Sequence, residues 1–460
     1  MTRRFAAGVL ALWLPALAAA QGTVPIQLPK ALVFPNYDNV LFGKDQALEG
    51  GAYIARAGDA SANFYNPAGL VLSEKTSLNA SSTGWVRTKL TSQALGTSVT
   101  SSKIDNVPGY LGAVIEPPYI NSRNIRIGLS LTRLVAWSPG GLDITSTNTG
   151  VDQLNRITYS ATSNFTTQLY QAAVAWAPVE DRSLRLGASF GLANTSYFSS
   201  GTLSGGVTDS TGNPGQFVST LRANGNEWDM VFGVGVQWDV LAGLTVGATI
   251  RSPGIKLTSS AVVTYESSQL ASVSTQQTNA TFLHDESGQF EYKLPAEVGI
   301  GIAYRFPNGQ VEADLRYHDA VSRYDFYRPS APLLVTSQTG STTTQSTQPL
   351  APITYAARRV FNGSIGANYK LGRVATLHGG FYTALSPVDD PVNSPLRQAD
   401  LYGITAGVDF QFEHFGLSIG AGYQFGSAPS TPISVAGQTA QGSGVDLQSI
   451  SILYAVSYQF

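Results

Sequence analysis

The sequence predicts an all-β protein, a transmembrane antiparallel β-barrel of about 14 strands with an N-terminal hatch (plug) inside its lumen. Three observations support this prediction. Apolar and polar residues alternate with a period of two in segments along the chain. Short connections between these segments alternate with long ones, and the N-terminus has the pattern of an export signal.

The alternation is clearest in the final segment, where apolar or aromatic residues point to one side and mostly serine, alanine and glutamine to the other. The apolar side carries Ile450, Ile452, Tyr454, Val456, Tyr458 and Phe460. We count about fourteen such segments, and their approximate spans are 75–90, 107–118, 123–137, 165–178, 183–198, 216–239, 243–266, 290–306, 309–323, 355–371, 373–385, 400–413, 415–426 and 447–460.

The connections distinguish a membrane barrel from a secreted β-sandwich or β-solenoid, which has no reason for a strict alternation of lengths. A bacterial outer-membrane barrel has short periplasmic turns and long external loops. The short set is 179–182, 240–242, 307–308 and 372, and the long Ser/Thr/Gly/Pro-rich set is 138–164, 199–215, 325–354 and 427–446. Aromatic residues near the segment ends fit an interfacial girdle: Trp137, Trp176, Trp228, Trp238, Tyr304 and Tyr458.

The bulk composition narrows the function classes. Charged residues make up 13% of the 460 residues and the formal net charge is −2, so nothing favours nucleic acid as a partner. The chain contains no cysteine, which excludes disulfides, thiolate metal ligands and cysteine nucleophiles.

The N-terminus predicts export through a cleaved signal peptide. Arg3 and Arg4 precede a short apolar run at 5–17 and three alanines at 18–20. We therefore expect a signal peptide at 1–20, an N-terminal extension and hatch at 21–74, and the barrel at 75–460. Such a multi-pass barrel lies in the bacterial outer membrane, where its partners are lipid, lipopolysaccharide and the barrel-assembly machinery.

No constellation of residues indicates an enzyme, a catalytic residue, a cofactor or a metal. The four histidines, His284, His318, His378 and His414, lie in different segments, and none has metal-ligand spacing. We see no serine and histidine arranged as nucleophile and base.

Two polar features call for an explanation. The alternation places four polar residues on the lumen face: Glu312, Asp314, Arg316 and His318. They form either a charged wall that guides solutes or anchors the plug, or a face that is solvated or self-paired. In the third strand Arg133 follows Ile125, Ile127, Leu129 and Leu131 in phase on the lipid face, where a charge at mid-bilayer costs roughly 2–4 kcal/mol. Either Arg133 lies at the rim, or the strand slips phase through a bulge around Thr132, Arg133 and Leu134.

Four stretches of the chain together resemble the FadL family of outer-membrane hydrophobic-compound transporters, which includes TodX-type aromatic hydrocarbon channels. They are GDASANFYNPAGL (58–70), RSPGIKL (251–257), LPAEVGIGIAYRF (294–306) and FYTALSPVDDPVNSPLRQAD (381–400). The resemblance implies a fourteen-stranded barrel and a hatch that contains Phe64, Tyr65, Asn66, Pro67, Ala68 and Gly69. It also implies an apolar pocket above the hatch and a lateral exit beside an inward kink of the third strand.

The function that the resemblance implies is passive uptake of a hydrophobic small molecule, either a long-chain fatty acid or an aromatic hydrocarbon. An apolar pocket stabilises such a ligand better than a watery pore does. Two alternatives stay open: a structural or adhesive outer-membrane barrel, and a general diffusion porin.

Overall fold

The protein is described from a computed structural model that covers most of the chain. The described residues are 35–92, 97–104, 109–117, 124–137, 142–147, 154–208, 214–272, 277–349, 352–389, 399–428, 433–435, 438–440 and 445–460. The expected signal peptide at 1–20 and the first part of the expected extension, 21–34, lie outside them. Within the described ranges no helix is long and apolar enough to cross a membrane.

The secondary structure is almost entirely β. Among the described residues, three short helices precede the first strand: η2 (Gln46–Glu49), α2 (Ala62–Tyr65) and η3 (Pro67–Leu72). The strands are β1 (Ser77–Ser92), β2 (Thr97–Ile104), β3 (Tyr110–Ile115), β4 (Ile125–Trp137), β5 (Leu142–Thr147), β6 (Leu154–Trp176), β7 (Leu184–Thr208), β8 (Pro214–Leu241), β9 (Leu244–Arg251), β10 (Ile255–Ser272), β11 (Gln277–Phe290), β12 (Glu297–Phe306), β13 (Gly309–His318), β14 (Val321–Arg328), β15 (Leu333–Thr339), β16 (Thr342–Gln348), β17 (Ile353–Ala357), β18 (Val360–Leu371), β19 (Ala375–Ala384), β20 (Asp400–Gln411), β21 (Phe415–Ala428), β22 (Ile433–Val435), β23 (Gln438–Ala440) and β24 (Val445–Gln459).

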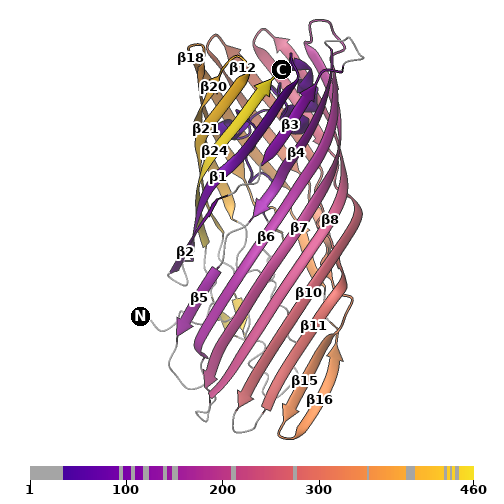
Figure 1. The fold of residues 1–460 in the computed structure, drawn as a ribbon, viewed down its shortest axis with the longest axis vertical. Coiled ribbons are helices and arrows are strands. Elements are labelled where there is room, and N and C mark those ends of the chain that lie inside the picture. The colour runs from indigo at the N-terminus through magenta and orange to yellow at the C-terminus, as the bar shows by residue number, and fades with distance from the viewer. Residues whose placement is uncertain are drawn as a thin grey trace.

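These strands form a closed antiparallel barrel (Figure 1). Each strand pairs with its neighbours around the molecule, and β24 pairs with β1 from Ser77↔Gln459 to Ser92↔Val445, which closes the sheet. Fourteen strands build the wall, because several labelled strands are two parts of one. For example, β9 and β10 both pair with β8 and are separated by Ser252, Pro253 and Gly254. The predicted fold class is confirmed.

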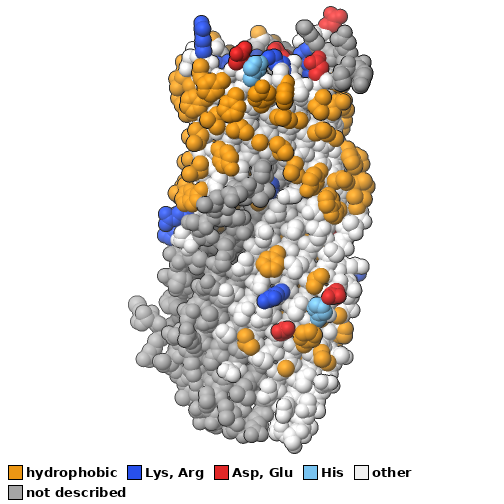
Figure 2. Space-filling model, in the orientation of Figure 1, with side chains coloured by type: hydrophobic (Ala, Val, Ile, Leu, Met, Phe, Trp, Pro, Cys, Tyr) orange, Lys and Arg blue, Asp and Glu red, His pale blue; other side chains and the backbone are white. Residues whose placement is uncertain are grey.

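An apolar belt surrounds one half of the barrel. Figure 2 shows hydrophobic side chains crowded over the upper half of the view, which holds the C-terminus, while they are sparse in the described part of the lower half. On β12, Val298, Ile300, Ile302 and Tyr304 are exposed and the residues between them are buried, so the alternation separates a lipid face from a lumen face. Four predicted girdle residues are exposed near strand ends beside short turns or the C-terminus: Trp176, Trp238, Tyr304 and Tyr458.

The long connections differ from the expected irregular loops, because much of their length continues the strands. The β7–β8 ladder runs unbroken to Thr208↔Pro214, across most of the expected 199–215 loop. Likewise, β14, β15, β16 and β17 occupy most of 325–354. Strand β16 is exposed along nearly its whole length, so it has no apolar alternation by which the sequence could predict it, whereas β14 and β17 bury Tyr324, Phe326 and Tyr355.

The N-terminal segment 36–72, which we call the hatch, lies inside the barrel. It has little regular structure, yet most of its residues are buried. The barrel accommodates it through inward-facing glycines. A Cβ at Gly187 would lie 2.3 Å from the backbone of Pro67 and Ala68, and one at Gly247 would lie 2.5 Å from the carbonyl oxygen of Ile54. The small lumen residues of the strands therefore let the hatch backbone approach the wall closely.

Candidate functional site

The stretch Asn66–Pro67 joins the hatch to the barrel wall. Asn66 is completely buried, and its side-chain amide donates hydrogen bonds of 2.9 Å to the carbonyl oxygens of Ile54 and Val236. Its Oδ1 accepts a hydrogen bond from the amide of Ala68 at 3.2 Å and so caps η3, with Pro67 at the first helical position. One side chain thus binds two hatch segments and strand β8.

The other residues of the motif pack against the hatch and the cavity above it. Phe64 and Tyr65 meet edge to face, with ring centroids 5.4 Å apart, and the Tyr65 hydroxyl donates to the carbonyl of Phe42 at 3.1 Å. Ala68 is buried, and a Cβ at Gly69 would clash with the carbonyl oxygen of Ala57. The motif therefore lies inside the lumen, as the resemblance implies.

Three of the four predicted lumen residues of β13 hold the hatch through its backbone. Asp314 Oδ2 accepts hydrogen bonds from the amides of Tyr53 and Ile54 at 2.7 and 3.1 Å, and Glu312 Oε1 accepts from the amide of Ala55 at 2.6 Å. Arg316 donates to the carbonyl of Gly51 at 2.8 Å. Because these amides belong to no ladder, the carboxylates satisfy donors that burial would otherwise leave unpaired.

His318 completes this wall by contacting Asp38, near the start of the hatch. The His318 Nε2 and Asp38 Oδ2 atoms are 2.8 Å apart, and Asn362 donates to the same oxygen at 2.6 Å. Burial opposes the charge of Asp38, but His318, Arg316 and Asn362 outweigh it and hold the pKa of this carboxyl well below its usual range. Asp38 is therefore ionised at neutral pH, and the contact with His318 is charge-assisted.

The sequence did not single out several charged residues that take part. Arg56 forms ion pairs with Glu49 and with Glu312, the latter with an N···O distance of 2.8 Å, and all three side chains are at most 5% exposed. Arg251, from the RSPGIKL stretch, donates to the carbonyl of Phe64 at 3.0 Å and lies 4.1 Å from its ring centroid. A charged residue in a hatch that is otherwise rich in apolar and small residues could have indicated a buried ion pair. The sequence does not show the partner, because in most of these contacts the partner is more than 180 residues away.

Replacing Glu312 with alanine is expected to loosen the hatch. Arg56 and the amide of Ala55 each lose a buried partner, and breaking one side of a buried pair costs about 3–5 kcal/mol. Hydrogen exchange of the amides at 50–57 measures the loss. The exposed Arg328–Asp325 pair gives the control, since Asp325→Ala should cost less than about 1 kcal/mol. Equal protection of 50–57 in Glu312→Ala and in the unmodified protein would contradict the anchoring role.

The third transmembrane strand, β4, slips register at the predicted place. Arg133 pairs with Gln168 on β6 and Val135 pairs with Thr167, so Leu134 is an extra residue. The slip reverses the alternation. Ile127 and Leu129 are exposed on the lipid face, whereas Val135, also an odd-numbered position, is buried on the lumen side. Arg133 itself is half-buried, and Thr132 is fully buried.

The wall is irregular on both sides of this bulge. Strand β1 has its own register shift at Gly84, between Thr83 and Trp85. Gly109 lies between β1 and β4. Its amide donates a hydrogen bond to the carbonyl oxygen of Ser81, and its carbonyl oxygen accepts one from the amide of Arg133, both at 2.8 Å. On the side of Gly109 that leads away from β3, β2 pairs with β1, and the end of β4 pairs with β6. Among the described residues, no pairing joins β2 to β4 or β5 (Figure 1). The backbone ladder is therefore interrupted beside Leu134.

A cavity lies directly inside this interruption. It encloses about 860 Å³ including its open mouth. Its walls come from the start of the hatch (Tyr37, Asp38, Val40, Leu41 and Phe42), from the motif (Phe64 and Tyr65), from the bulge (Leu134 and Val135), and from Val231, Arg251, Leu294 and residues of β12, β13, β18 and β19. The hatch motif, the bulge and the polar wall thus border one space.

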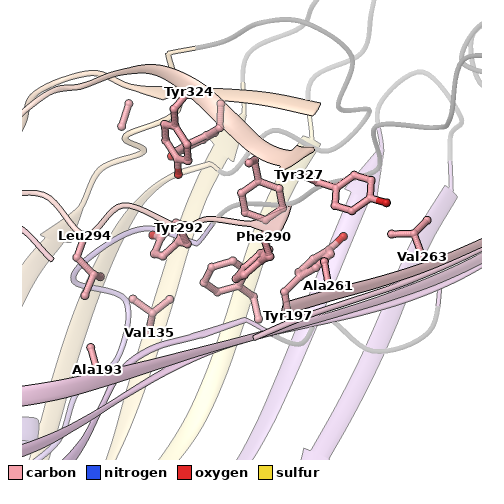
Figure 3. Packing of buried hydrophobic residues seen from close by; sticks show 14 of the residues in the cluster. Val135, Ala193, Tyr197, Ala261, Val263, Phe290, Tyr292, Leu294, Tyr324 and Tyr327 are labelled. Atoms are coloured by element: carbon pink, nitrogen blue, oxygen red, sulfur yellow. The ribbon is translucent and has the colours of Figure 1, made fainter. Parts of the chain in front are cut away.

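An aromatic cluster continues from this cavity through the lumen, away from the hatch. Figure 3 shows Tyr197, Phe290, Tyr292 and Tyr324 projecting into the barrel near Val135 and Leu294. The rings interlock, with Phe165 and Tyr292 centroids 4.7 Å apart and Phe290 and Phe326 centroids 4.9 Å apart. Val135 and Leu294 belong both to this cluster and to the cavity wall, so the two form a continuous apolar region.

Comparison with known proteins gives matches in structure only. No family model and no curated protein matches the sequence. Among solved structures, a Pseudomonas aeruginosa FadL homologue matches with a TM-score of 0.60 at 14% identity, over 92% of this chain and 100% of that one. The Pseudomonas putida toluene transporter TodX matches with a TM-score of 0.56 at 14% identity, over 93% and 100%.

A third match is the CymD monoaromatic hydrocarbon channel, with a TM-score of 0.53 at 15% identity, over 92% of this chain and 98% of that one. Identities this low compare the folds alone. The protein has the fourteen-stranded, hatch-containing barrel fold of the FadL homologue and the TodX-type channels.

Proposed function

We propose that this protein is a bacterial outer-membrane channel for passive uptake of hydrophobic small molecules, with long-chain fatty acids and aromatic hydrocarbons as the ligand classes. One observation carries the proposal: an internal cavity lined by Phe64, Tyr65, Leu134 and Val135 lies beside an interruption in the backbone ladder of the wall. The similarity in fold to a FadL homologue and to toluene and monoaromatic channels supports it.

In this mechanism the ligand enters the lumen from outside and follows the aromatic cluster inward to the cavity. The cavity removes the ligand's apolar surface from water, which favours binding by roughly 25 cal/mol for each Å² buried. The hatch closes the path toward the periplasm, because Asn66 and the β13 wall attach it to the barrel. The ligand then leaves sideways beside Leu134 into the membrane. No energy source is needed, since the ligand moves down its own concentration gradient.

The geometry favours this function over the two alternatives. A general diffusion porin needs an open aqueous lumen, whereas here the hatch is packed against the inward-facing glycines of the wall. An adhesive barrel gives no reason for a cavity that connects an apolar lumen to an interrupted ladder.

Ligand binding by the purified protein tests the proposal. We expect organic extraction of protein purified in a mild detergent to release a co-purified apolar molecule at about one per chain, identified by mass spectrometry. We also expect toluene or palmitate to compete for the same site. Protein boiled before extraction provides the control for detergent and lipid carried over. Absence of a stoichiometric apolar molecule, together with absence of binding by both probes, would contradict the proposal.

A further inference from the structure

At the end of the hatch that faces the short turns, two carboxylates and a histidine converge. A ring nitrogen of His378 and one carboxylate oxygen each of Asp45 and Asp409 all lie within 4.8 Å of one another. His378 and Asp409 come from the barrel strands β19 and β20, near the ends of those strands, and Asp45 comes from the hatch. Asp45 is 30% exposed at its side chain, so a solute reaches the cluster from the periplasmic side.

The contacts of His378 show which ring nitrogen remains available to a further ligand. Nδ1 lies 2.6 Å from Glu49 Oε1, and the side chains of both residues are at least 99% buried. Glu49 also forms an ion pair with Arg56 and accepts a hydrogen bond from Asn368 at 2.9 Å. As a carboxylate in these contacts, it accepts the hydrogen bond that His378 Nδ1–H donates. When the imidazole is neutral and its proton is on Nδ1, Nε2 carries no hydrogen and has a free lone pair. Nε2 is buried and has no hydrogen-bond partner among the described residues.

A lone pair beside two carboxylates is stabilised either by a proton on the nitrogen or by a metal cation bound between the three groups. A carboxylate that holds the far nitrogen of a ligating histidine is also the usual outer shell of a zinc site. Asp45 supplies a second unused acceptor, because its Oδ1 is buried without a hydrogen bond. His378 and Asp45 therefore each carry an acceptor atom without a hydrogen bond in this cluster.

Lys44 is the resident cation for part of this cluster. Its Nζ lies 3.0 Å from Asp409 Oδ2, 2.9 Å from Gln411 Oε1 and 3.9 Å from Asp45 Oδ1. It gives no hydrogen to His378 Nε2, so the ammonium satisfies the aspartates and leaves the imidazole unsatisfied. A metal ion that binds all three residues therefore competes with the ammonium of Lys44, which turns toward water on its flexible stem.

We propose that a divalent transition metal ion, with Zn²⁺ as its representative, binds between Asp45, His378 and Asp409. Imidazole nitrogen and carboxylate oxygen are suitable zinc ligands, with bond lengths of about 2.0–2.2 Å, and three protein ligands leave a position for water. The chain has no cysteine, so no thiolate competes for the ion. Tetrahedral coordination requires the side chains to rotate and shorten the 4.8 Å span.

The bound ion ties the hatch to the barrel. Asp45 belongs to the hatch and the other two ligands to the wall, so the metal acts as a cross-link at the periplasmic end, opposite the cavity. This site does not depend on the proposed transport function, and the presence or absence of zinc binding leaves that proposal unchanged.

Isothermal titration of the full chain with ZnCl₂ tests the site. The protein is purified in detergent with a tag that contains no histidine and is stripped with EDTA. We expect one Zn²⁺ per chain, and an affinity lower by at least about tenfold in His378→Gln and in Asp45→Asn. Lys44→Met removes the competing ammonium and should bind at least roughly tenfold more tightly. His284→Gln, which removes the exposed histidine paired with Glu286 at 2.9 Å, is the matched control and should bind as the unmodified protein does.

Heat-modifiable electrophoretic migration verifies that each variant is a folded barrel, and the half-exposed Asp45 supplies a test if His378→Gln does not fold. Hydrogen exchange gives a second measurement, since Zn²⁺ should slow exchange at 44–50 in the unmodified protein and not in Asp45→Asn. The proposal is overturned if no stoichiometric binding occurs, if Asp45→Asn or His378→Gln binds with unchanged affinity, or if Lys44→Met binds more weakly.

Discussion

Deleting Leu134 is expected to reduce uptake of the hydrophobic ligand at least about tenfold while leaving the barrel folded, since a barrier increase of 1.4 kcal/mol suffices for this factor. Leu134 is the extra residue of the β4 bulge. Without Leu134 the β4–β6 ladder continues unbroken. Val135 then follows Arg133 directly and takes the same face as Thr132, which is buried. Val135 therefore stays on the lumen side. The straightened strand can then pair on its free edge and close the lateral exit.

Two controls separate closure of the exit from general damage. Leu134→Ala keeps the bulge and should retain most of the uptake. Deleting Gly340, at the tip of the β15–β16 hairpin, removes a residue at which an added Cβ would meet no atom within 4 Å, and it should have no effect on uptake. The measurement is uptake of radiolabelled ligand by cells that contain equal amounts of folded protein. Full uptake by the Leu134 deletion variant would rule out an exit beside β4.

Replacing Asn66 with glycine and Pro67 with alanine is expected to open the hatch to ions. The change removes both hydrogen bonds that Asn66 donates, to Ile54 and Val236, and removes the cap on Ala68. Each buried group left unsatisfied costs about 1–3 kcal/mol, and loss of proline adds chain entropy to the unfolded hatch. Conductance across planar bilayers should rise from almost none to a steady, measurable level.

Asn194→Gly provides the matched control, because Asn194 hydrogen-bonds Asn226 and the backbone of Glu227 within the wall and contacts no hatch residue in the bonds described. That variant should stay closed. A large steady conductance in the unmodified protein would instead favour a diffusion porin, and unchanged conductance in the double variant would make the stretch 58–70 a linker without a sealing role.

The barrel could be predicted from the sequence wherever one strand face meets lipid and the other meets the lumen. Ile300 and Tyr304 on β12 illustrate this, since their exposure alternates with buried Gly301 and Ala303. Outside the membrane that physical contrast is lost. The stretch 199–215 was therefore expected to be a loop, although 199–208 and 214–215 are paired in the β7–β8 ladder.

The place of the bulge could be predicted, although the sequence left a rim position for Arg133 open, because Arg133 continues a lipid-facing series in which a charge is costly. The hatch contacts could not. The amides that Asp314 and Glu312 accept from belong to Tyr53, Ile54 and Ala55, more than 250 residues earlier. A period-two pattern places these carboxylates in the lumen and says nothing of what fills it. The convergence of Asp45 with His378 and Asp409 was missed for the same reason, since no sequence spacing links them.

Uptake by cells that lack this protein tests the central claim most directly. A deletion strain, its parent and a complemented strain are supplied with radiolabelled long-chain fatty acid and with a labelled monoaromatic hydrocarbon at low concentration, where diffusion through the outer membrane is slow. We predict that the deletion strain takes up at least one of the two ligands markedly more slowly than its parent, and that complementation restores the rate. Equal uptake of both ligands by the deletion strain and its parent would contradict the assignment of this barrel as a channel for these hydrophobic compounds.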